Sequence, residues 1–280
     1  MLIKIPANTP HKTTHMRKLV TILFCTLTIQ SYAQKGLNPG IIYNLADFNK
    51  KAAVAEWLYK YDIVAWLTSD SAMAQDKKEV ALLGKEWFCF QDKSDVWHAV
   101  YGKYDRGTFD QVFHFTLDRS LKIKRVHDKV DTLMVNTYSR ALNTANKLFA
   151  VYKDSIHNIS FNPYIRQNED KTLTVWFLPA FQKNNVIIYG GEFIYTIDRA
   201  GNKLLKDESY YKGKLLGFKV DKPRTIMINY SEVETPTLGA IFFVWSFKKY
   251  FTNIYIECAH SKSTVIKDEN NVYTWVHAEK

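Results

Sequence analysis

Apolar residues recur at two different spacings along the chain, and the change between them marks the predicted elements. From residue 44 to residue 74 they return every three or four positions, which predicts an amphipathic helix. This stripe consists of Val54, Trp57, Leu58, Tyr61, Val64 and Ala65. Asn44 is a suitable N-cap for the helix. Asp70 and Ser71 could divide it into two shorter helices.

A second helical stripe predicts a helix over residues 131–152. Between the two helices, over residues 86–126, apolar and polar residues alternate with a period of two, which predicts strands. The predicted strands are Trp87–Phe90, Val96–Tyr104, Phe109–Asp118 and Lys122–Val126. Because short turns such as residues 105–107 join them, they are expected to form an antiparallel meander.

The chain after residue 173 is predicted to continue as strands without a further helix. These strands are Leu173–Leu178, Asn185–Ile197, Tyr211–Phe218, Thr225–Tyr230, Ala240–Tyr250, Asn253–Cys258, Ser263–Ile266 and Val272–His277. Gly190 and Gly191 fall within one of them and indicate a bulge. A parallel α/β fold would place helices between most strands. The sequence therefore predicts an α+β fold, mainly antiparallel β-sheet, with two principal helices at about 44–74 and 131–152 packed on it.

A short internal similarity links two of the predicted strands. Phe113–Arg119 reads FHFTLDR and Phe193–Arg199 reads FIYTIDR, and each ends a strand at an Asp-Arg turn. Two explanations are open. One is a duplication with halves 34–155 and 156–280, and the other is that apolar strands commonly end at a polar turn. Both interpretations leave residues 34–280 as one domain.

Residues 16–34 have the three-part pattern of a cleavable secretory signal. Arg17 and Lys18 form its basic region, an apolar run of 11 residues follows at 19–29, and Ser31 and Ala33 are the small residues before the cut. We expect Met16 to be the true start and cleavage to fall between Ala33 and Gln34. The apolar run is too short for a membrane span, which needs about 20 residues. The bulky Phe24 before Cys25 argues against lipid attachment. The predicted product is a soluble domain, secreted or periplasmic.

Removal of the predicted signal peptide lowers the net charge of the chain. Residues 1–33 hold four basic and no acidic residues, so 34 basic and 28 acidic residues remain, a net charge of +6. Lys and Arg alternate with Asp and Glu rather than forming the patch expected of a nucleic-acid-binding protein. We therefore expect no nucleic-acid partner, and a mildly cationic surface compatible with glycans or an anionic envelope surface.

Two cysteines remain in the mature chain, Cys89 and Cys258, each within a predicted strand. Export allows a disulfide between them. Two separate buried thiols are the alternative, because a free cysteine packs as a small apolar side chain. The sequence leaves the choice open.

Motifs of catalysis and of nucleotide binding are absent from the sequence. It contains no GxGxxG, no GxxxxGK[ST], no GxSxG, no HExxH and no CxxC. No catalytic, cofactor-binding or metal-binding residue is therefore assigned, and no cofactor is expected.

Two weaker candidates remain. The first is a zinc site built from His98, His114 and His127-Asp128, because two of these histidines could face each other across a hairpin.

The second candidate is a carboxylate pair. Glu232 and Glu234 are two positions apart and point to one side of an extended chain, as a glycoside hydrolase would require. Each candidate also has an ordinary structural alternative. The histidines could form hydrogen bonds at a sheet face, and Glu232 and Glu234 could belong to a polar loop. His260, next to Ser261, is a further candidate for a hydrolytic site.

Aromatic residues are the least ordinary feature of the composition, with 7 Trp, 17 Tyr and 17 Phe. Most of them are expected to pack in the core of a β-rich protein. Some fall near predicted strand ends or loops, where they could contact a ligand. These are Tyr43, Tyr164, Tyr210, Tyr211, Tyr250 and Tyr273. The function predicted first is a non-enzymatic binding or envelope-associated module, and the alternative is an exported hydrolase, metal-dependent or otherwise.

Overall fold

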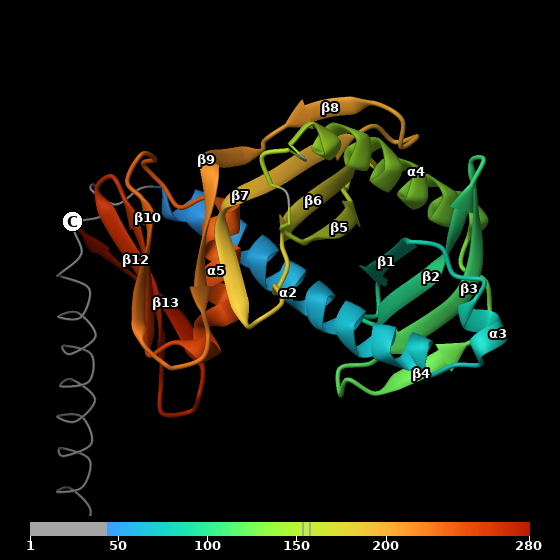
Figure 1. Ribbon diagram of the computed structural model, residues 1–280, viewed down its shortest axis with the longest axis horizontal. Coiled ribbons are helices and arrows are strands. Elements are labelled where there is room, and N and C mark those ends of the chain that lie inside the picture. The colour runs from blue at the N-terminus through green and yellow to red at the C-terminus, as the bar shows by residue number, and fades with distance from the viewer. Residues whose placement is uncertain (1–43, 153, 157) are drawn as a thin grey trace, which may run out of the picture. The chain divides into compact units, whose positions relative to one another are not determined.

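The computed structural model describes residues 44–152, 154–156 and 158–280. The predicted signal peptide, its cleavage site and Tyr43 lie outside these residues. The described chain forms three sheets and three longer helices, so the predicted α+β fold with mostly antiparallel strands is confirmed (Figure 1).

The two predicted helices are both present. Helix α2 spans Leu45–Met73, and the side chain of Asn44 accepts hydrogen bonds from the first turn, as expected of an N-cap. It is one helix, so the suggested division at Asp70 and Ser71 is wrong. The Ser71 hydroxyl bonds to the carbonyl of Leu67 at 3.1 Å, which satisfies this polar side chain inside the helix. Helix α4 spans Thr132–Phe149 and is capped by Asp131, and a 3₁₀ turn continues to Tyr152.

The first sheet is the predicted meander. Its strands are β1 (Glu86–Gln91), β2 (Trp97–Asp105), β3 (Thr108–Leu117) and β4 (Ile123–Val126), paired in that order and antiparallel throughout. A short helix, α3 (Lys77–Val80), precedes it.

The second sheet is formed by β5 (Phe161–Gln167), β6 (Leu173–Pro179), β7 (Val186–Ile197), β8 (Leu204–Asp207) and β9 (Tyr210–Lys219). The sequence pattern did not predict β5, which contains Pro163. An edge strand tolerates proline, because one row of its backbone donors needs no partner in the sheet. Gly190 has a φ of 103°, and the register of β7 shifts between Tyr189 and Gly191, which confirms the predicted bulge.

The third sheet corrects the prediction for the C-terminal region. Strands β10 (Thr225–Tyr230) and β11 (Asn253–Cys258) run parallel, and β12 (Ser261–Lys267) and β13 (Tyr273–Glu279) complete the sheet. Residues 240–250, predicted as a strand, form helix α5 (Leu238–Phe247) and a 3₁₀ turn. Parallel neighbours require a crossover connection, and a helix supplies it here. Because α5 is apolar all round and almost wholly buried, its sequence carries no helical period.

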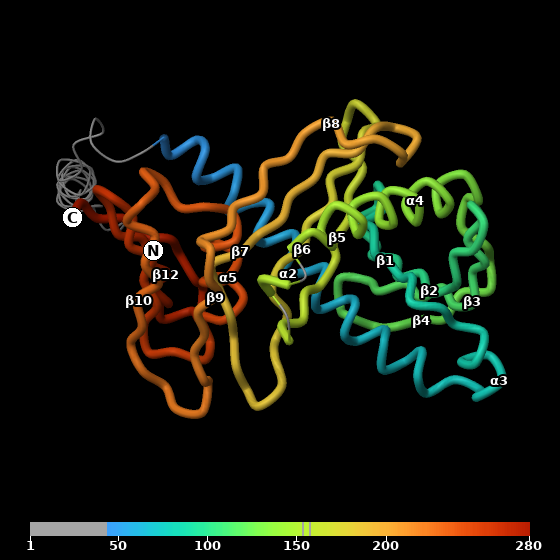
Figure 2. Tube along the Cα trace, turned by 45° about the horizontal axis from the view of Figure 1, so that its top comes forward, coloured from blue at the N-terminus to red at the C-terminus, as the bar shows by residue number. Residues whose placement is uncertain are grey.

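Helix α2 connects the three sheets. Phe48 near its start packs edge-on against Trp275 of β13, with the ring centroids 5.0 Å apart. Asp62 in its middle accepts a hydrogen bond from Tyr164 of β5 at 3.1 Å. Thr68 near its end bonds to the Tyr101 hydroxyl of β2 at 2.8 Å. Figure 2 shows the helix running along all three sheets, while α4 covers the first two.

The two similar segments occupy corresponding places in the first and second sheets. Phe113–Leu117 ends β3, and Phe193–Ile197 ends β7, each the third strand of a meander that follows a helix. The next residue, Asp118 or Asp198, accepts backbone hydrogen bonds from the turn that follows. The shared Asp therefore has the same local role at both positions, and the duplication stays a prediction.

None of the helices in the described residues combines the length and the apolar character that crossing a bilayer would require.

Candidate functional site

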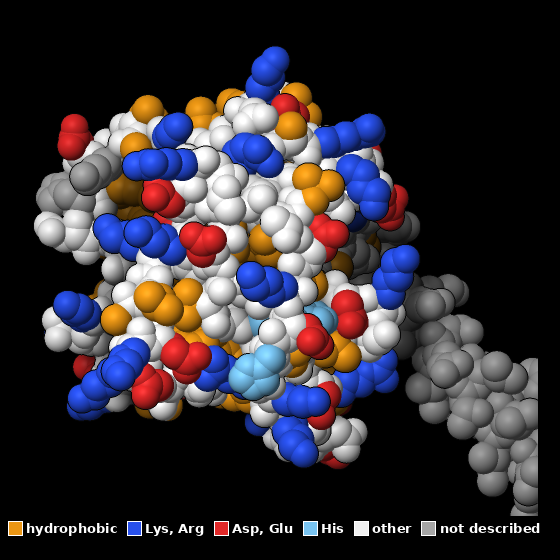
Figure 3. All heavy atoms as spheres, turned by 90° about the vertical axis from the view of Figure 1, so that its right-hand side faces the viewer, with side chains coloured by type: hydrophobic (Ala, Val, Ile, Leu, Met, Phe, Trp, Pro, Cys, Tyr) orange, Lys and Arg blue, Asp and Glu red, His pale blue; other side chains and the backbone are white. Residues whose placement is uncertain are grey.

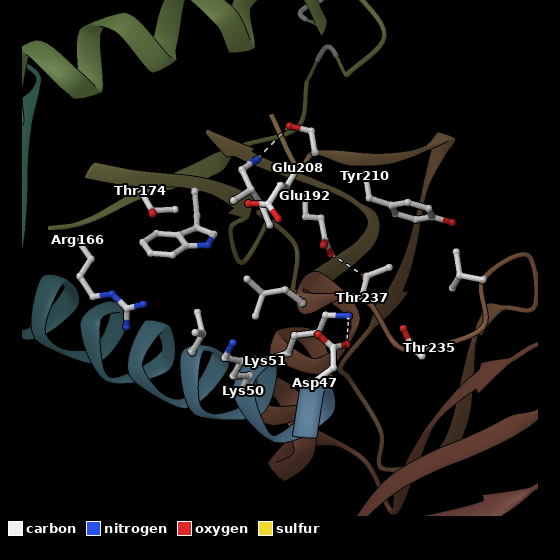
Figure 4. A pocket seen from close by; sticks show the side chains of 16 residues that line it. Asp47, Lys50, Lys51, Arg166, Thr174, Glu192, Glu208, Tyr210, Thr235 and Thr237 are labelled. Carbon is white, nitrogen blue, oxygen red and sulfur yellow. Dashed lines mark hydrogen bonds and ion pairs between the residues drawn. The ribbon is translucent and has the colours of Figure 1, made fainter. Parts of the chain in front are cut away.

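A cleft of about 670 Å³, the larger of two hollows that Arg166 lines and named here the principal cleft, lies between α2 and the second sheet, and its volume is within the range of ligand-binding pockets. Its lining includes Asp47, Lys50, Lys51, Val54, Arg166, Thr174, Trp176, Glu192, Ile194, Glu208, Ser209, Tyr210, Val233, Thr235, Thr237 and Leu238. Figure 4 shows Arg166 at one end of the cleft and Tyr210 and Thr235 at the other.

One face of α2 forms a wall of the cleft. Asp47, Lys50, Lys51 and Val54 follow helical spacing, so their side chains point to the same side. Lys51 pairs with Asp47 at 2.7 Å and also donates to the carbonyl of Pro236 at 3.2 Å. Lys50 is exposed and has no ion-pair partner among the described residues. It is therefore available to a ligand.

Arg166 of β5 is half-buried and is held by two indole rings. Its guanidinium carbon lies 5.1 Å from the ring centroid of Trp57 and 5.5 Å from that of Trp176, both within cation–π range. Burial lowers the pKa of Arg166, but an arginine keeps its charge in proteins. In the described chain no carboxylate pairs with it and no acceptor takes a hydrogen bond from its N–H groups. The site therefore holds a fixed positive charge whose hydrogen-bond donors are unused.

Glu192 is the most deeply buried charged group in the cleft, with 4% of its surface exposed. It follows the bulge in β7, and its Oε2 accepts a hydrogen bond from the Thr237 hydroxyl at 2.7 Å and another from the backbone N–H of Gly239. Burial raises its pKa from 4.5 to about 7, although these two hydrogen bonds act in the opposite direction. Because Oε2 already accepts two hydrogen bonds, the proton of the acid form is expected on Oε1.

The other acidic groups of the cleft are already paired. Glu208 pairs with Lys206 at 2.8 Å, and Asp47 pairs with Lys51. With Glu192 partly neutral near pH 7, the cleft offers more uncommitted positive than negative charge. Lys50 and Arg166 carry that excess.

A second hollow of about 450 Å³ adjoins the principal cleft at Arg166, which lines both. Its other lining residues are Trp57, Phe90, Gln91, Asp92, Lys93, Met134, Tyr138, Ile165 and Gln167. Arg166 and its two supporting indole rings therefore stand at the junction of two spaces.

The candidate zinc site is not assembled in the structure. His98 and His114 do face each other, with Nδ1 of His98 2.9 Å from Nε2 of His114. His98 also approaches Asp92 at 3.3 Å, and Nδ1 of His114 lies 3.2 Å from the backbone carbonyl of Asp128. Asp128 thus contributes its carbonyl oxygen, and His127 lies at the exposed surface. No group of three or more His, Cys, Asp or Glu side chains in the described residues is arranged to hold a metal ion.

The carboxylates of Glu232 and Glu234 have separate partners. Glu232 accepts hydrogen bonds from Tyr210 and Lys212, whereas Glu234 lies 3.4 Å from Nε2 of the exposed His260. Neither lines the cleft. Of the aromatic residues at strand ends, Tyr210 lines the cleft, and Tyr164 is buried in the core.

Cys89 and Cys258 are both buried and free, which settles the alternatives in favour of separate thiols.

Arg166 and Glu192 were missed by the sequence analysis. A signal existed for Glu192, because it is the single charged residue in the otherwise apolar segment Val186–Ile197. Arg166 had none, because β5 itself was not predicted. The chain matches no protein-family model, no curated protein and no solved structure.

Proposed function

We propose that the chain is an exported, non-enzymatic binding module whose principal cleft holds an anionic ligand. The observation that carries this proposal is the unpaired guanidinium of Arg166, half-buried and fixed by Trp57 and Trp176. Partial burial removes some of the water that would otherwise solvate this charge, and no carboxylate among the described residues replaces it. A ligand carboxylate, sulfate or phosphate would supply the partner, in the bidentate geometry that arginine favours.

Several features of the rest of the chain support a binding role. The signal pattern of residues 16–34 favours export. Within the described residues, the candidate histidines His98, His114, His127 and His260 do not converge in one cleft, so they do not support a hydrolytic centre there. On the face shown in Figure 3, basic and acidic side chains are interspersed, which favours a local binding cleft over a wide cationic surface.

The proposal is tested by thermal-shift measurements on the purified protein with matched anionic and neutral saccharides, peptides and small acids. We expect at least one anionic compound to raise the melting temperature of the wild type while its neutral counterpart does not. Arg166→Met should abolish the shift, because methionine can still pack against the two indole rings but carries no charge. Arg199→Met, which removes the same charge from an exposed turn, is the matched control. Equal shifts for the wild type and Arg166→Met would contradict the proposal.

Export is tested separately by intact mass spectrometry of protein recovered from outside the cytoplasm. We expect a chain that begins at Gln34. Full-length protein retained inside the cell would contradict this part of the proposal.

An exported hydrolase acting in the same cleft is the second candidate, and Glu192 is the observation that favours it. A carboxyl group with a pKa of about 7 can donate a proton at neutral pH, as a general acid must. If the protein is such an enzyme, Glu192→Gln should abolish turnover of the ligand that binds to the wild type but leave its affinity within a few-fold. A ligand recovered intact after prolonged incubation with the wild type would exclude this candidate.

A further inference from the structure

We propose that the ligand is a uronate-bearing oligosaccharide that passes over Arg166 from the principal cleft into the second hollow, so that Arg166 binds a carboxylate in the interior of the saccharide. This inference rests on the proposed function and specifies its ligand.

The placement of Arg166 argues for an extended ligand. A ligand confined to the principal cleft would have its anionic group at one end, because Arg166 lies at the edge of that cleft (Figure 4). The second hollow shares Arg166 with this cleft and is lined by Asp92 and by Gln91, Lys93 and Gln167, whose side chains can hydrogen-bond to saccharide hydroxyl groups. A chain molecule with an acid in its interior fits both spaces.

The length of the cleft wall agrees with this assignment. Asp47 and Trp57 lie ten residues apart on α2, and at a rise of 1.5 Å per residue the wall extends over about 15 Å. Lys50 on this wall is the second uncommitted cation of the cleft, after Arg166 on β5, and would meet a second acidic residue of the same ligand. Two separated positive charges favour a ligand that carries several acidic groups over a ligand that carries only one.

The polar groups of the cleft favour a saccharide over a peptide. The strands beneath it, β6 and β7, are paired on both sides, so their backbone groups are not free to add a peptide strand. The lining instead presents the hydroxyl group of Thr235 and the carboxyl of Glu192, together with the hydroxyls of Thr174 and Ser209, which already bond to Asn168 and to the backbone N–H of Ile194. Side-chain groups of this kind pair with the many hydroxyl groups of a sugar.

The test is isothermal titration calorimetry of the mature protein with galacturonate as monomer, trimer and hexamer. A neutral hexasaccharide and hexaglutamate serve as comparison ligands. We expect the hexamer to bind at least tenfold more tightly than the monomer and than either comparison ligand. Arg166→Met should weaken the hexamer at least tenfold, with Arg199→Met as the charge-matched control.

Variants in the two spaces test the path of the saccharide. Lys50→Met in the principal cleft and Gln91→Ala in the second hollow should each weaken the hexamer several-fold. Arg166→Met should weaken monomer and hexamer alike. Monomer and hexamer binding with equal affinity would overturn the extended path, and tighter binding of hexaglutamate would overturn the ligand class. In both cases, the proposed function would stand if binding still depends on Arg166. Absence of Arg166-dependent binding by any anion would overturn both proposals.

Discussion

The carboxyl group of Glu192 in β7 accepts a hydrogen bond from Thr237, the N-cap residue of α5, at 2.7 Å. Thr237 in turn accepts from the backbone N–H of Ala240 at 3.2 Å, so one hydroxyl joins the strand to the first turn of the helix. A carboxylate is favoured at the positive end of a helix. Glu192 therefore fixes the start of α5 against the second sheet while it lines the cleft.

Replacement of Glu192 by Gln is expected to change how stability depends on pH. The pKa of Glu192 is raised from 4.5 to about 7, so between these values the folded protein holds a proton that the unfolded chain has lost. The free energy of unfolding of the wild type therefore falls as pH rises through this window, by about 3 kcal/mol from this group. Urea titrations at pH 4 and pH 8 should show Glu192→Gln equal to the wild type at the lower pH and more stable at the higher. Equal stability of the two proteins at pH 8 would contradict the prediction that burial raises the pKa of Glu192.

Gly239→Ala is expected to destabilise the protein through Glu192. A Cβ atom at position 239 would collide with Oε2 of Glu192, and no other side chain is so close to it. Elsewhere in a helix the same substitution is favourable by up to about 1 kcal/mol. Denaturant unfolding should show Gly239→Ala to be less stable than the wild type, and most of this loss should disappear in a Glu192→Ala background. A loss of the same size in both backgrounds would exclude Glu192 as its cause.

The fold was predictable where the sequence period reflects one buried face. Helix α4 and the first meander each have a polar side facing water, so their residues repeat with a recognisable period. Helix α2 was predicted from the apolar stripe between Val54 and Ala65, although over its full length its apolar residues are spread around the helix. Helix α5 has no such period, because it is surrounded by protein, and a short apolar run is compatible with either a helix or a strand. The cleft depends on this missed helix, since Thr237, Leu238 and Gly239 position Glu192. It depends equally on the contacts of Arg166 with Trp176 in the neighbouring strand and with Trp57, more than a hundred residues earlier in the chain, and β5 itself was not predicted.

The histidine pair is expected to make the protein less stable in mild acid. Nδ1 of His114 faces a carbonyl oxygen and must carry a hydrogen, so Nε2 accepts a hydrogen bond from His98. Burial lowers the pKa of His114 below 6.5. As pH falls below about 6.5, the unfolded chain takes up a proton that folded His114 resists, and the free energy of unfolding decreases. NMR titration of the His114 ring should give a midpoint below 6.5.

The control for this histidine prediction is a substitution at a surface position. His114→Gln should reduce the loss of stability between pH 7 and pH 5.5, whereas His127→Gln, at an exposed histidine, should leave it in place. A midpoint for His114 above 6.5 would contradict the prediction, because it would mean that protonation of His114 stabilises the folded protein.

The thiols of Cys89 and Cys258 are expected to be inert in the folded protein. Both are buried, and burial raises the pKa of Cys258 to about 11 and that of Cys89 well above its usual value. The thiolate is the reactive form, so at pH 8 each thiol is both shielded and protonated. The mature chain treated with a thiol reagent should label slowly when folded and at both cysteines once it is unfolded in denaturant without reductant. Absence of labelling after unfolding would reveal a disulfide, and rapid labelling of the folded chain would show that at least one thiol reaches solvent.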